Sequence, residues 1–317
     1  MYKQDENWPG VYWLTSKNGE KSILDLRNCK KIAVGISGGA DSTSMLYIVS
    51  RIIKDEGLDI EVTPHTFLHH GKPWNPGVAK RAAEMVSSML DIKYGEHVFK
   101  DFGPQGPTAE IKSVFVDKFM SYTHGLTSGP TKEYDRFFGA TTSNPNSDHL
   151  REHPDCDKSR NVSYYEPQII DMGNGQCEIL VQPHVPLSYN SSPYKWVDKK
   201  MTATVYETYD LGETLLPYTR SCELLHLQTK NFQLNCSTAN FKHNVAGGNG
   251  TGRDHYVCWW CQEREWAFEG SGIDANAWVP LPEMKDEGYI CPEFGVLPKM
   301  SAILHNPAWV EKDHKSE

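Results

Sequence analysis

Two groups of residues in this 317-residue chain have types and spacings that suit chemistry. The first is the stretch Ser37-Gly38-Gly39-Ala40-Asp41-Ser42. Glycines let the backbone approach a ligand closely and leave N–H groups directed outward, which favours the binding of a phosphate group. The stretch lacks the lysine of a G-x-x-x-x-G-K-[ST] loop, so it predicts a different kind of phosphate loop.

The second group is a set of metal-binding residue types in the C-terminal half. Cys258 and Cys261 form a C-x-x-C pair, which supplies two of the four ligands of a tetrahedral zinc site. Cys222 and His255 would complete a closed, structural Cys₃His site. Free buried thiols and a redox pair are the alternatives. A redox pair is disfavoured because this C-x-x-C does not open a helix after a strand.

The elements that position the first group follow an alternating pattern. Strands are expected at 31–36, 59–67, 92–99 and 136–140, with helices after the glycine stretch and at 76–90 and 108–122. Such alternation predicts an α/β fold with a mostly parallel, doubly wound sheet. Ligands bind such sheets at the carboxyl ends of the strands, which is where the glycine stretch begins.

The rest of the chain is divided by composition. We expect an extension at 1–29 with a turn at Lys17–Gly19, an ATP-binding α/β domain at 30–192, a helical zinc-binding region at 193–269 and a tail at 270–317. Residues 142–176 are polar and predict a long loop that folds over the site, or an insertion without contact to it. A short strand is expected at 178–181. The apolar spacing over 193–210 predicts an amphipathic helix, with Lys195, Lys199 and Lys200 solvated on its other faces.

The pattern S-G-G-x-D-S resembles the pyrophosphate-binding loop of the PP-loop ATP pyrophosphatase superfamily. Within it, the chain is similar to the 7-cyano-7-deazaguanine synthases, whose zinc region reads roughly T-x-S-C, an insert, then C-G-x-C-x-x-C-x-x-R. The matching positions are Thr219, Ser221, Cys222, Cys258, Cys261 and Arg264. His255 stands where the family has its first cysteine, and Cys236 in the insert is the alternative fourth ligand.

The resemblance implies an ATP-dependent carbon–nitrogen ligase that converts 7-carboxy-7-deazaguanine and ammonia to the nitrile, with release of AMP and pyrophosphate. Backbone donors of Ser37, Gly38, Gly39, Ala40, Asp41 and Ser42 would hold the phosphates. Asp41 would help to hold Mg²⁺, and the hydroxyls of Ser37 and Ser42 would add hydrogen bonds. ATP, Mg²⁺ and Zn²⁺ are the expected cofactors, with Asp41 and Ser37 as the expected catalytic residues.

Substrate contacts are harder to assign from the sequence. The family's D-Y-G-Q segment corresponds to Leu68-His69-His70-Gly71-Lys72, where only the glycine is kept. His65, His69 and His70 lie near the expected strand end, and each is more often a surface or core residue than a ligand. His153-Pro154-Asp155-Cys156 is a candidate counterpart of the family's Y-P-D-C segment. No general base can be identified.

Composition limits the alternatives. The net charge of −9 argues against a general nucleic-acid binder, and no apolar run approaches a membrane span, so a cytoplasmic protein without a membrane partner is expected. Since members of the family commonly self-associate, a homodimer is one expected state. Three other functions remain open: a related ligase that stops at the amide or uses another amine, an enzyme of tRNA sulfur or amide chemistry, and a non-catalytic binding module.

Overall fold

The computed structural model describes residues 1–68, 75–102, 109–153, 156–219 and 259–275, together with the short paired strands β12 (Ile290–Cys291) and β13 (Gly295–Val296). The side chains of 109–115, 260–261, β12 and β13 lie outside the description.

The central element is a five-stranded sheet in the order β11-β7-β4-β5-β6, in which all neighbouring strands are parallel. Its strands are β4 (Lys31–Gly35), β5 (Glu61–Phe67), β6 (Val98–Lys100), β7 (Arg136–Phe138) and β11 (Asn190–Ser191). The central position of β4 explains its apolar, β-branched sequence, because a strand with neighbours on both sides and helices over both faces is buried throughout.

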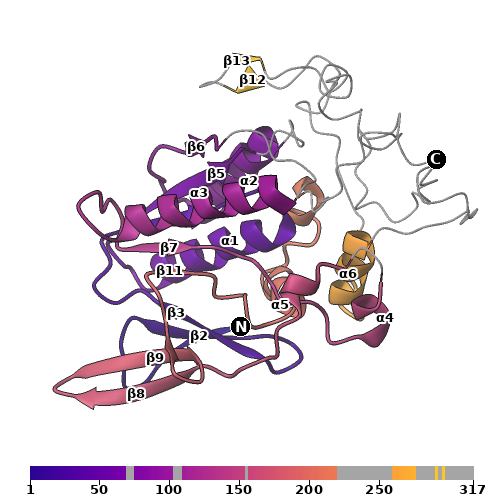
Figure 1. The fold of residues 1–317 in the computed structure, drawn as a ribbon. Helices are drawn as coiled ribbons and strands as arrows, with labels where there is room; N and C mark the ends of the chain where they lie inside the picture. The colour runs from indigo at the N-terminus through magenta and orange to yellow at the C-terminus, as the bar shows by residue number, and fades with distance from the viewer. Residues whose placement is uncertain are drawn as a thin grey trace, which may run out of the picture.

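Helices cover both faces of this sheet (Figure 1). The helices are α1 (Ala40–Asp55), α2 (Asn75–Leu90) and α3 (Ala109–Thr127). Ile32 and Val34 of β4 pack in the main core with α1 and α2, whereas Ala33 packs in a second cluster with aromatic residues of α3 and β7. Alternate residues of β4 thus face opposite helical layers. The predicted α/β class with a parallel sheet is confirmed, and the arrangement is compatible with a doubly wound fold.

The N-terminal residues form a three-stranded antiparallel sheet of β1 (Tyr2–Gln4), β2 (Val11–Thr15) and β3 (Lys21–Asp25). The predicted turn at Lys17–Gly19 is confirmed, and Gly19 has a positive φ of 86°. Leu14 and Leu24 belong to the main core, so this sheet packs on the body of the protein.

Two expectations for the middle of the chain were wrong. The stretch 142–176 is not one long loop: it holds α4 (Asp148–Arg151), η1 (Lys158–Arg160) and β8 (Gln168–Gly173). Strand β8 pairs with β9 (Gln176–Gln182), which pairs with β10 (Val185–Pro186), and the β8–β9 hairpin extends away from the parallel sheet (Figure 1).

The helix expected at 193–210 is also shorter than predicted. Helix α5 covers Lys200–Thr208, and turns form the chain just before it. Two further helices follow, η2 (Leu216–Tyr218) and α6 (Trp259–Phe268).

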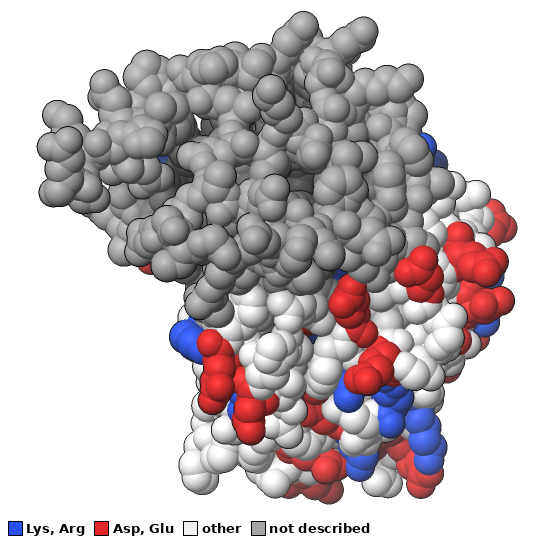
Figure 2. Space-filling model, turned by 90° about the vertical axis from the view of Figure 1, so that its right-hand side faces the viewer, with Lys and Arg blue, Asp and Glu red and all other residues white. Residues whose placement is uncertain are grey.

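The surface carries both signs of charge. On the face in Figure 2, Lys and Arg side chains lie among Asp and Glu side chains, and no continuous basic stripe is seen among the residues coloured there. None of the helices in the described ranges is both long enough and apolar enough to span a membrane.

Candidate functional site

The glycine loop leaves β4 at the point where the strand order of the sheet reverses. Strands β5 and β6 lie on one side of β4, and β7 and β11 lie on the other. Open α/β sheets bind ligands outside the carboxyl ends of their strands at such a reversal. The loop ends at α1, and the N-terminus of a helix carries a partial positive charge. The predicted residues 37–42 therefore lie together at a position suited to an anion.

Hydrogen bonds within the loop fix its shape. The Ser37 N–H donates to Ser42 Oγ at 3.0 Å, and the Gly39 N–H donates to Ser37 Oγ at 3.3 Å. The two hydroxyl oxygens are 3.1 Å apart, and Ser42 Oγ also donates to the Gly39 carbonyl at 3.2 Å. The serines thus brace the loop from within, and the N–H groups of Ser37 and Gly39 are directed at their hydroxyls.

Gly38 is the position at which only glycine fits. Its φ is +76°, and a Cβ there would lie 2.5 Å from Val78 Cγ1 and 2.9 Å from the Ala79 nitrogen. Helix α2 therefore packs directly on the loop backbone. Asn75 at its start donates from Nδ2 to the Ser37 carbonyl at 2.6 Å, which adds a second tie between α2 and the loop.

Asp41 in the first turn of α1 is bound by two residues at the start of α5. Thr202 Oγ1 donates to Asp41 Oδ1 at 2.7 Å, and Lys199 Nζ lies 3.1 Å from Asp41 Oδ2. The Asp41 side chain is 23% exposed, whereas that of Lys199 is only 4% exposed. Each carboxylate oxygen of Asp41 thus already has a protein partner on α5.

Lys199 continues into a buried chain of alternating charges. Its Nζ lies 2.9 Å from Oε2 of Glu263 in α6, whose side chain is fully buried. The other oxygen, Glu263 Oε1, lies 2.6 Å from Arg160 Nη2 in η1. Arg160 also donates to Thr142 Oγ1 at 2.8 Å and to the Thr142 carbonyl at 2.9 Å. Two carboxylates and two cations so connect α1, α5, α6 and η1 in one charge chain, Asp41–Lys199–Glu263–Arg160.

The surroundings of Lys199 keep it charged. Burial alone lowers the pKa of a lysine, but Asp41 and Glu263 together outweigh burial and hold the pKa of Lys199 above its usual value. The prediction that Lys199 is solvated was therefore wrong. Lys199, Glu263 and Arg160 are site residues that the sequence did not indicate, because no local pattern states which distant charges will pair.

His65 lies in a different environment from the one expected of a substrate ligand. It is 1% exposed on β5 and packs against Tyr134, Tyr122 and Phe137, on the face covered by α3. Neither ring nitrogen has a hydrogen-bond partner, and burial lowers the pKa of His65 to about 4. His65 is thus a neutral core residue.

The other predicted contacts lie largely outside the described residues. These are His69, His70 and Lys72 of the segment after β5, the zinc candidates Cys222, His255, Cys258 and the alternative Cys236, and the side chain of Cys261. Within the described part of the chain, no group of three or more potential metal ligands is present. Of the candidate Y-P-D-C counterpart, Cys156 is buried with Leu150 and Trp259, so it packs against α6.

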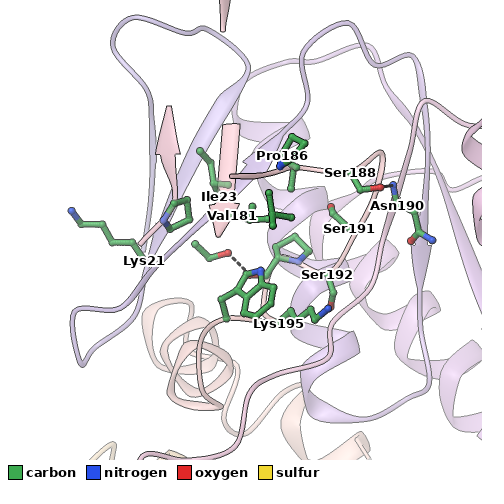
Figure 3. Close-up of a pocket in the computed structure, with 15 residues that line it drawn as sticks. Lys21, Ile23, Val181, Pro186, Ser188, Asn190, Ser191, Ser192 and Lys195 are labelled. Carbon is green, nitrogen blue, oxygen red and sulfur yellow. Dashed lines mark hydrogen bonds between the residues drawn. The ribbon is translucent and has the colours of Figure 1, made fainter. Parts of the chain in front are cut away.

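A cavity of about 160 Å³ lies at the β11 edge of the sheet (Figure 3). Ile23, Val181 and Pro186 form apolar walls, and Asn190 and Lys195 are among its polar lining residues. None of residues 37–42 lines it. The cavity is therefore separate from the glycine loop.

Comparisons with protein-family models and with curated proteins found no match to this chain. The assignment of the site thus depends on its geometry and on the sequence motif.

Proposed function

We propose that this protein is an ATP-dependent carbon–nitrogen ligase that activates a carboxylate by adenylation at residues 37–42. The observation that carries the proposal is the braced glycine loop, which joins the carboxyl end of β4 to the N-terminus of α1 where the strand order reverses. The fit of Gly38 against α2 supports it, because this backbone could not carry a side chain there.

In the proposed reaction, a substrate carboxylate oxygen attacks the α-phosphorus of ATP. The bond from this phosphorus to the oxygen bridging to the β-phosphorus breaks, and pyrophosphate leaves. Ammonia then attacks the acyl carbon, a proton is released and AMP leaves, which gives an amide. A second ATP adenylates the amide oxygen with release of a second pyrophosphate, and loss of AMP and of the two N–H protons gives the nitrile. In this proposal, backbone N–H groups of the loop and the buried Lys199 ammonium, 3.1 Å from Asp41, would stabilise charge on the phosphates.

The substrate in the proposal is 7-carboxy-7-deazaguanine, which follows from the resemblance to 7-cyano-7-deazaguanine synthases. The net charge of −9 supports a small-molecule substrate over a nucleic acid. Incubation with ATP, magnesium and 7-carboxy-7-deazaguanine, with and without ammonia, tests this. Mass spectrometry is expected to show the nitrile only when ammonia is present. An amide as the final product would favour the related ligase, and recovery of unchanged carboxylate would contradict the proposal.

The proposal includes Mg²⁺ and Zn²⁺. Because Thr202 and Lys199 already occupy both oxygens of Asp41, the phosphates of ATP are expected to be the main ligands of Mg²⁺. Zinc is assigned to Cys222, His255, Cys258 and Cys261 by resemblance alone. Metal analysis of fresh protein is expected to find one zinc per chain, lost in Cys258→Ser. If His255→Ala keeps zinc and Cys236→Ser loses it, the fourth ligand is Cys236.

A further inference from the structure

The ammonium of Lys199 has two carboxylate partners that come from different parts of the fold. Asp41 belongs to the glycine loop and is partly exposed, whereas Glu263 belongs to α6 and is fully buried. Both oxygens of Glu263 face a cation: Lys199 Nζ lies 2.9 Å from Oε2, and Arg160 Nη2 donates to Oε1 at 2.6 Å. The Arg160 guanidinium is fixed in turn by Thr142 and lies over the Trp259 ring at 5.2 Å. Glu263 is therefore the buried anchor of Lys199, and Asp41 is the partly exposed one.

We propose that Glu263 is a positioning residue, which holds the Lys199 ammonium in place beside the glycine loop while a nucleotide polyphosphate is bound there. The inference rests on the proposed function for the identity of the ligand. If Lys199 paired with Asp41 alone, any shift of the Asp41 carboxylate on ligand binding would also shift the Lys199 ammonium. The second anchor on α6 prevents this movement.

Such an anchor acts on the chemical step more than on binding. Donors that are already in position stabilise the charge that develops on the leaving pyrophosphate without reorganisation. Glu263→Gln keeps the size of the side chain and removes its charge. The four-residue charge chain is neutral as a set, so this change leaves an excess of positive charge, which does not weaken the binding of a polyanion. The Lys199 ammonium would nevertheless turn toward Asp41 and lose its place.

The test compares kcat for AMP release with the Kd for ATP, measured by calorimetry on the full chain. For Glu263→Gln, kcat is expected to fall at least about ten-fold while Kd for ATP changes less than about three-fold. Glu263→Asp keeps the charge and is expected to retain a higher kcat than Glu263→Gln. Glu269→Gln, at an exposed position just after α6, is the matched control and should leave both quantities unchanged.

If Glu263 acts by positioning Lys199, the fall in kcat caused by Glu263→Gln must depend on the presence of Lys199. In a Lys199→Met background, Glu263→Gln is expected to change kcat less than about two-fold further, because the residue that it positions is already absent. A wild-type kcat in Glu263→Gln would overturn the inference. The inference would also be overturned if Glu263→Gln lost kcat and ATP binding to the same extent and Glu263→Asp restored neither. Because the aspartate side chain is one methylene shorter and holds Lys199 less closely, kcat of Glu263→Asp is expected to lie between those of wild type and Glu263→Gln. If Glu263→Gln fails to fold, a wild-type kcat in Glu263→Asp contradicts the inference.

A second measurement separates this inference from the proposed function. In protein labelled with ¹⁵N-lysine, the Nζ signal of Lys199 is identified by its loss in Lys199→Met. That signal is expected to shift or broaden in Glu263→Gln and to stay unchanged in Glu269→Gln, with no nucleotide added. Absence of ATP turnover in the wild type would sink the proposed function, whereas an unchanged Nζ signal in Glu263→Gln would sink the positioning role.

Discussion

The two helical layers of this protein bury ionisable side chains in opposite ways. On the α3 side, His65 is enclosed by aromatic rings, has no hydrogen-bond partner and has a pKa lowered to about 4 by burial. On the α1 side, Lys199 is enclosed as completely, yet two carboxylates raise its pKa above the usual value. Burial without a counter-charge removes the charge of a group, and burial between counter-charges keeps it. Only the second environment can hold a charge for a reaction.

Removing the Lys199 ammonium from the α1 side is expected to lower the free energy of unfolding more than the other substitutions tested for stability. Lys199→Met leaves Asp41 and the buried Glu263 without one of their partners, and should lower the free energy of unfolding by about 3 kcal/mol. Urea unfolding at pH 7.5 measures this change. Lys195→Met, at an exposed lysine of the same segment, serves as control and should stay within about 0.5 kcal/mol. Equal stabilities of the two variants would show that the charge chain does not stabilise the fold.

The unpaired histidine on the α3 side should make the fold sensitive to acid. The pKa of His65 is about 4 in the fold and 6.5 in the reference state. Below pH 6.5 the unfolded chain therefore binds a proton that the folded chain excludes, so stability falls with pH down to about 4 and then levels off. Between pH 7.5 and pH 5 this should cost about 2 kcal/mol.

The measurement for His65 is urea unfolding at these two pH values in wild type and His65→Phe. Between pH 7.5 and pH 5, the free energy of unfolding of His65→Phe is expected to fall by about 2 kcal/mol less than that of wild type, because the contribution of the histidine is absent. Identical pH dependence in the two proteins would mean that His65 is protonated in the fold or exposed to water.

The smallest change in stability is expected from Thr202, the second partner of Asp41. Thr202→Val keeps the shape of the side chain and removes the 2.7 Å hydrogen bond to Asp41 Oδ1. We expect a loss of about 1 kcal/mol in unfolding free energy, because Asp41 is partly exposed and water can replace the hydroxyl. Thr208→Val, at an exposed position at the end of α5, is the control. A loss larger than that of Lys199→Met would show that Thr202, not Lys199, is the main partner of Asp41.

The glycine loop and the parallel sheet could be predicted from the sequence because their determinants are local. Ser37 and Ser42 bond each other across a few residues, and the apolar run of β4 marks a buried strand. The helix over 193–210 was predicted too long for a related reason. Tyr194 and Val197 are buried as the spacing suggested, but they lie in turns, so apolar spacing alone did not distinguish turns from helix.

The β8–β9 hairpin was not predicted, although the sequence contains a hairpin-turn motif. Asn174 and Gly175 both have positive φ, at 54° and 72°, and join β8 to β9. An Asn-Gly pair between two runs with apolar residues is typical of a hairpin turn. The charge chain had no such signal. Lys199, Glu263 and Arg160 come from segments far apart in the sequence, and only the packing of α5, α6 and η1 around the loop brings them together.

The most direct test of the account identifies the nucleotide product. Wild-type protein incubated with ATP, magnesium, 7-carboxy-7-deazaguanine and ammonia is expected to release AMP and pyrophosphate, separated by anion-exchange chromatography. Asp41→Asn removes the carboxylate charge that pairs with Lys199 at the loop, and it should reduce turnover at least about ten-fold, equivalent to about 1.4 kcal/mol of transition-state stabilisation. Release of ADP and phosphate in place of AMP and pyrophosphate would contradict the assignment of residues 37–42 as a pyrophosphate-binding loop.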